Sequence, residues 1–95
     1  MSRRIQIEGV SFSPDHYIGG ARVASPETFE DRSPLDWSWK LAEIARGDAE
    51  TAKTAVTAAE AAFPAWAALS ASERAEFMRR LAELIDAHVA SIARV

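Results

Sequence analysis

The chain has 95 residues, no cysteine and a formal net charge of −3 at neutral pH. Its length suits one small domain, and its lack of cysteine excludes a disulfide framework, a thiolate metal site and a cysteine nucleophile within these residues. The negative charge and the lack of a clustered basic face argue against nucleic-acid binding. No apolar run approaches the roughly 20 residues that span a bilayer. We therefore expect a cytoplasmic protein without nucleic-acid or membrane partners.

Residues 1–46 show the pattern of short strands separated by turns. The expected strands lie at residues 5–7, 16–18, 21–23, 28–31 and 40–45. In the first of them, Ile5 and Ile7 alternate with a polar residue, as in a half-buried strand. Gly19-Gly20 separates the second and third strands and allows positive φ at both central positions of a tight hairpin. Ser33-Pro34-Leu35-Asp36 predicts another turn.

Residues 47–95 show a helical pattern instead. Asp48 is expected to cap the first helix, because its carboxylate can accept hydrogen bonds from the free amides of the first turn. Apolar residues then recur at helical spacing as far as Pro64. Proline lacks an amide proton and disfavours helix in the residue before it, so the helix is expected to end near residue 63. Trp66 is expected to anchor the junction to the next helix.

Ser70 and Glu73 have the spacing of a capping box, which predicts the start of a second helix. Apolar residues between Phe77 and Ile92 then form one wide face, typical of an amphipathic helix. The sequence as a whole predicts an α+β fold. Short antiparallel strands, over about residues 3–45, precede two α-helices at about residues 48–63 and 70–94.

Histidine, glycine and basic residues suggest no site. His16, beside Asp15, and His88 are not spaced as a ligand pair, and no third ligand type clusters with them. We interpret both as structural residues, with His88 partly buried on the apolar helix face. The four glycines form neither a dinucleotide-binding motif nor a phosphate-binding loop. The basic pair Arg3-Arg4 is interpreted as solvated.

Acidic and aromatic residues of the first half give the remaining candidates. The carboxylates interpreted as solvated loop charges, rather than as an acid and base pair, are Glu27, Glu30, Asp31 and Asp36. Trp37 and Trp39 would share one face of a strand, where they could stack on a ligand or pack against a neighbouring surface. We assign no catalytic, cofactor-binding or metal-ligating residue in this chain.

An ordered set of short motifs carries a resemblance to a known family. The motifs are His16-Tyr17-Ile18-Gly19-Gly20, Glu27-Thr28-Phe29-Glu30 with Ser33-Pro34, Ala45-Arg46-Gly47-Asp48-Ala49-Glu50, the apolar residues from Ala55 to Trp66, Ser72-Glu73-Arg74 and Leu81-Ala82-Glu83-Leu84-Ile85. In this order and spacing, the chain from about His16 to Ile92 resembles the N-terminal segment of NAD(P)-dependent aldehyde dehydrogenases. The stretch from Leu35 to Lys40 lacks the glycine of many members and resembles a subset that includes semialdehyde dehydrogenases of aromatic catabolism.

The resemblance implies an N-terminal portion of the α/β aldehyde dehydrogenase fold, with one partial domain over residues 1–95. Within it, residues 1–46 are a strand and turn region and residues 47–95 a helical region. The family oxidises an aldehyde to a carboxylic acid: a cysteine thiolate attacks the aldehyde, hydride passes to NAD or NADP, and a glutamate activates water. Some members also bind a monovalent cation near the residues before Ser33-Pro34, but no such site is assigned here.

The resemblance places the cysteine, the glutamate and the cofactor-binding segments after Val95. We therefore expect a fragment that is catalytically inactive alone and binds no cofactor by itself. Its expected partner is the remainder of an aldehyde dehydrogenase subunit, or further copies in a homo-oligomer of the full-length enzyme. An alternative interpretation is a small non-enzymatic interaction module, which would dock through its C-terminal amphipathic helix.

Overall fold

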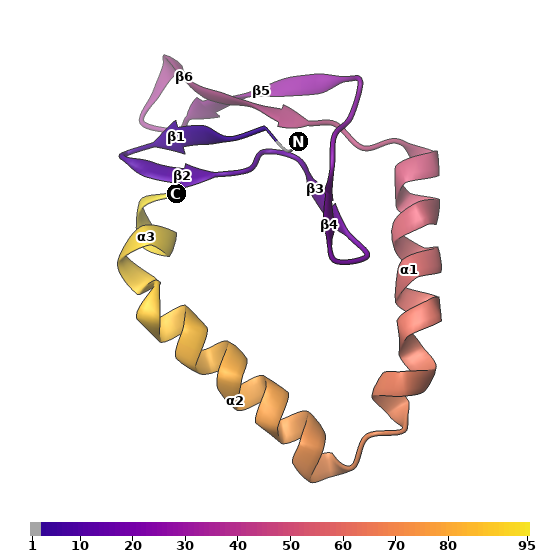
Figure 1. Cartoon of the computed structure of the whole chain (residues 1–95). Coiled ribbons are helices and arrows are strands. Elements are labelled where there is room, and N and C mark those ends of the chain that lie inside the picture. The colour runs from indigo at the N-terminus through magenta and orange to yellow at the C-terminus, as the bar shows by residue number, and fades with distance from the viewer. Residues whose placement is uncertain (1–2) are drawn as a thin grey trace.

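The computed structural model describes residues 3–95, and its strands precede its helices, as the sequence predicts (Figure 1). The elements in chain order are β1 (Ile5–Ile7), β2 (Val10–Phe12), β3 (His16–Ile18), β4 (Ala21–Val23), β5 (Thr28–Ser33), β6 (Asp36–Ala45), α1 (Ala49–Ala67), α2 (Ala71–Ala87) and α3 (Val89–Arg94). The strands pair as three antiparallel hairpins, β1 with β2, β3 with β4 and β5 with β6. The predicted α+β class is thereby confirmed.

Two of the hairpins turn through residues with positive φ. Gly19 and Gly20 have φ values of 60° and 80°, which confirms the predicted tight turn between β3 and β4. The β1–β2 turn uses Glu8 and Gly9, with φ values of 51° and 78°. Strand β2 was not predicted, because its turn carries a glutamate where such turns usually have glycine or asparagine. Strands β5 and β6 both extend further toward their shared turn than predicted.

The core of the protein is small. The buried apolar residues among those described are Ile7, Pro14, Ala42 and Ala45. They lie where β1 meets β6, and the amide of Ala45 donates a hydrogen bond to the carbonyl of Pro14 at 3.1 Å. Only small or medium side chains fill this core, so the strand region has little apolar area with which to hold the long helices in place.

Helix α1 begins as predicted but ends later. Asp48 caps it: its Oδ1 accepts hydrogen bonds from the amide and the hydroxyl of Thr51, both at 2.9 Å. The prediction that the helix ends near residue 63 was wrong, because α1 continues through Pro64 to Ala67. The fixed φ of proline is compatible with helix, so the chain keeps its helical path although a hydrogen bond is lost and the ring crowds the carbonyl of Glu60. The next turn closes normally, since the amide of Ala68 donates to the carbonyl of Pro64 at 3.1 Å.

The second predicted helix, residues 70–94, is divided in two. Its start is confirmed, because Ser70 and Glu73 form the capping box with hydrogen bonds of 3.1 and 3.3 Å. His88 leaves the helical conformation, with φ −116° and ψ 16°, and separates α2 from α3. Its Nδ1 lies 2.9 Å from the carbonyl oxygen of Leu84 and competes for an acceptor of the helix ladder. The helix was predicted to be continuous because apolar spacing does not report such side-chain competition.

Helix α1 leads away from the strand region, and α2 and α3 lead back toward it, so the two long helices diverge from their junction (Figure 1). Trp66 and Phe77 meet at the junction of α1 and α2, with ring centroids 5.6 Å apart, which confirms Trp66 as its anchor. Helix α3 returns to β2 beside the first hairpin. The radius of gyration is 16.6 Å, against about 12 Å for a compact chain of this length. The protein is therefore considerably less compact than a typical globular chain of its length.

Candidate functional site

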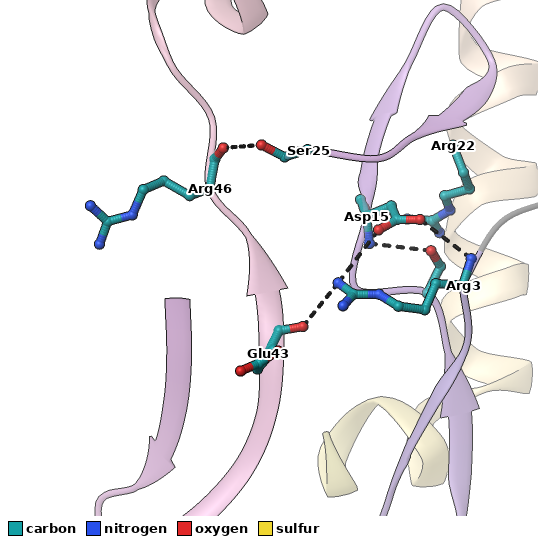
Figure 2. A network of polar contacts seen from close by, with 7 residues as sticks. Arg3, Asp15, Arg22, Ser25, Glu43 and Arg46 are labelled. Atoms are coloured by element: carbon teal, nitrogen blue, oxygen red, sulfur yellow. Dashed lines mark hydrogen bonds and ion pairs between the residues drawn. The ribbon is translucent and has the colours of Figure 1, made fainter. Parts of the chain in front are cut away.

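A polar cluster around Asp15 joins the first two hairpins to β6 (Figure 2). The side chain of Asp15 is 4% exposed, and its Oδ1 lies 3.6 Å from Nη2 of Arg3. Arg3 also donates to the carbonyl of Glu43 on β6 at 3.1 Å, and Arg22 donates to the carbonyl of Asp15 at 3.3 Å. The carboxylate of Asp15 is paired with Arg3, and its backbone carbonyl accepts a hydrogen bond from Arg22. We therefore interpret Asp15, Arg3 and Arg22 as a structural cluster, which we call the clamp, rather than as a reactive site.

The clamp was missed at the sequence level, where Arg3-Arg4 was interpreted as solvated. Both arginines are exposed, as predicted, but each also has a partner: Arg3 pairs with Asp15, and Arg4 donates from Nε to the hydroxyl of Ser11 at 2.9 Å. The partners of both arginines lie several residues away along the chain. No local pattern of charge could therefore have revealed them.

His16 lies under the start of α1. A hollow of about 390 Å³ opens here between Tyr17 and the first turns of the helix. A β-carbon on Gly47 would lie 3.3 Å from Cε1 of His16, so a larger residue here would crowd the ring. Nε2 of His16 is buried and makes no hydrogen bond to any of residues 3–95. The ring packs beside Gly47 and lines this hollow.

No acid and base pair forms from the predicted candidates. The carboxylate of Asp15 is committed to Arg3, and no hydrogen bond joins it to His16. His88 was predicted to be partly buried, but it is exposed and lines an open hollow with Phe12 and Arg22 of the first two hairpins. No three of the His, Asp and Glu side chains in this part of the chain lie close enough together to hold a metal ion.

The acidic residues of β5 and β6 make local contacts with their neighbours. Glu27 and Glu30 are exposed, and Asp31 is half-buried. The hydrogen bond and charge of Arg32 lower the pKa of Glu30, with a smaller contribution from Lys40. Hydrogen bonds from the hydroxyl and the amide of Ser38 lower the pKa of Asp36. The lowered pKa values of Glu30 and Asp36 favour their charged forms, in agreement with the interpretation of these two residues as surface charges.

The residues present do not fit a nicotinamide cofactor. A dinucleotide pyrophosphate is commonly held by free amides at a helix N-terminus that follows a glycine-rich turn. At α1, the carboxylate of Asp48 occupies those amides, and hydrogen bonds from Thr51 lower the pKa of Asp48 so that it stays charged. The His16 ring lies beside Gly47 at this helix end. A pyrophosphate at this helix end would find the amides already bonded to Asp48 and would be repelled by the negative charge of that carboxylate.

The two tryptophans of β6 lie at its exposed end. Trp37 is 75% exposed and Trp39 is 49% exposed. Arg32 donates to the carbonyl of Trp37 at 3.0 Å and pairs with the carboxylate of Glu30. The alternatives of ligand stacking and protein packing both stay predictions, because no facing group from another element lies over these rings among the described residues.

The most extensive candidate surface is apolar and lies on the helices. Large side chains that are roughly half exposed or more are Val56, Phe63 and Trp66 on α1, Phe77, Met78, Leu81, Leu84 and Ile85 on α2, and Val89 and Ile92 on α3. We call these residues the helix faces. The chain as a whole exposes 7525 Å², whereas a compact protein of its mass exposes about 5,400 Å². The difference, roughly 2,000 Å², has the scale of a large protein–protein interface.

Comparison with known proteins gives one match. A family model described as the aldehyde dehydrogenase family matches residues 22–95, which extend from β4 to the end of α3. No curated protein and no solved structure matches the chain. No helix among residues 3–95 combines the length and the apolar character that crossing a bilayer requires.

Proposed function

Because the chain belongs to the aldehyde dehydrogenase family, we propose that it serves as the amino-terminal scaffold of an oxidoreductase that converts an aldehyde to a carboxylic acid with NAD(P)⁺. The family match includes both long helices, α1 and α2, as well as the β5–β6 hairpin. The stretch at residues 35–40, which resembles semialdehyde dehydrogenases, favours a semialdehyde as the substrate.

The exposure of the helix faces is the observation that carries this proposal. Helices in proteins gain most of their stability from packing of their apolar face against other elements. Leu81 and Leu84 are each about half exposed, although full burial of one such side chain would contribute roughly 1.5–3 kcal/mol. Helices α1 and α2 diverge from their junction (Figure 1), and the large apolar side chains along both are exposed. We propose that the cofactor-binding and catalytic segments of the subunit cover these side chains.

The chemistry itself must come from outside these 95 residues. The family's thioester step needs a cysteine thiolate as nucleophile, and the chain has no cysteine. The carboxylate of Asp15 is paired with Arg3, and Asp48 caps the amides at the start of α1, so neither place offers a free group for a cofactor. The role of the chain is then to position helices that support the reacting segments.

The test uses two polypeptides. The first is this chain, and the second carries the glycine-rich cofactor segment and the catalytic cysteine of a family member. Neither is expected to reduce NAD⁺ or NADP⁺ with a panel of aldehydes and semialdehydes when assayed alone. The mixture is expected to form reduced nicotinamide, followed by its near-ultraviolet absorbance. A matched pair of variants sharpens the test: Leu81→Asp lies on the helix faces and should prevent assembly, whereas Arg79→Asp lies on the opposite, exposed side of α2 and should not.

A second candidate function rests on the same helix faces. A non-enzymatic interaction module would dock α2 as a helix in an apolar groove of another protein. The two candidates differ in what α1 contributes. An interaction module needs α2 and α3 alone, so substitution of Val56 and Phe63 on α1 by serine would leave its binding unchanged. A dehydrogenase scaffold uses both helices, and the same substitutions should weaken assembly with the catalytic polypeptide.

A further inference from the structure

We draw no further inference here: the strongest candidate, the exposed apolar face of helices α2 and α3 from Phe77 to Ile92, carries none beyond the proposed scaffold because nothing in the structure shows what covers it.

Discussion

Replacing Leu84 by alanine tests whether the helix faces are solvated in the chain by itself. Leu84 is 51% exposed, so only about half of its apolar area leaves water on folding. Full burial would contribute roughly 1.5–3 kcal/mol, which leaves about 1 kcal/mol for this site. No cavity forms at an open surface, and alanine is a slightly better helix former than leucine. We therefore expect Leu84→Ala to lower the free energy of unfolding by about 1 kcal/mol or less.

Ile7 provides the matched comparison, because its side chain is 8% exposed and lies in the small core. Truncation of a buried isoleucine to alanine costs about 2–5 kcal/mol, since burial is lost and a cavity remains. The milder Ile7→Val, at about 0.5–1.5 kcal/mol, keeps the comparison usable if Ile7→Ala fails to fold. Urea unfolding followed by far-ultraviolet circular dichroism measures each change. A loss of 3 kcal/mol or more for Leu84→Ala would refute the reasoning, because it would mean that α2 is already covered.

Three further predictions concern local contacts. Asp15→Asn removes the charge that pairs with Arg3. The amide of Ala45 donates to the carbonyl of the adjacent Pro14, and we expect this amide to exchange with solvent about tenfold faster in the variant. An unchanged exchange rate would show that the clamp does not stabilise this contact. Gly20→Ala should destabilise the β3–β4 hairpin by about 1 kcal/mol, measured by amide exchange in β3, because φ is 80° there; a neutral effect would contradict the turn geometry. The pKa of Asp48 is lowered in the folded state, so its stabilisation of α1 is complete above the ordinary aspartate pKa and is lost as pH falls through the lowered value. In Asp48→Asn, the helicity of α1 should no longer depend on pH in this acid range.

Features that depend on a few neighbouring residues could be predicted from the sequence. The Gly19-Gly20 turn follows from the conformational freedom of glycine, and both helix starts follow from side chains that accept hydrogen bonds three residues ahead. These signals are local, so their outcome does not depend on how the rest of the chain packs.

Features that depend on competition between contacts could not be predicted in the same way. The helix passes through Pro64 because the following turn still closes its own hydrogen bonds. It breaks at His88, where Nδ1 lies within hydrogen-bond distance of the Leu84 carbonyl, although the apolar spacing continues without interruption. The pairing of Arg3 with Asp15 joins residues that the first hairpin brings together. In each case the outcome depends on geometry that residue spacing does not contain.

In the candidate site, too, some features could be predicted from the sequence and others could not. The sequence supported no assignment of a catalytic residue, and the structure leaves His16 packed against Gly47 and the carboxylates in local pairs. The apolar pattern of α2 was evident from the sequence. Its exposure was not, because periodicity predicts which residues share a face but gives no information about whether another element covers that face.

The central claim is that these residues form a scaffold on which the rest of an aldehyde dehydrogenase assembles. It is tested most directly by assaying reduced nicotinamide formation from the chain, from a polypeptide with the catalytic cysteine and cofactor segment, and from their mixture. The account predicts aldehyde oxidation in the mixture only, with loss of activity when Leu81→Asp replaces the native chain. Oxidation by the 95-residue chain alone, or equal oxidation by the catalytic polypeptide without it, would contradict the account.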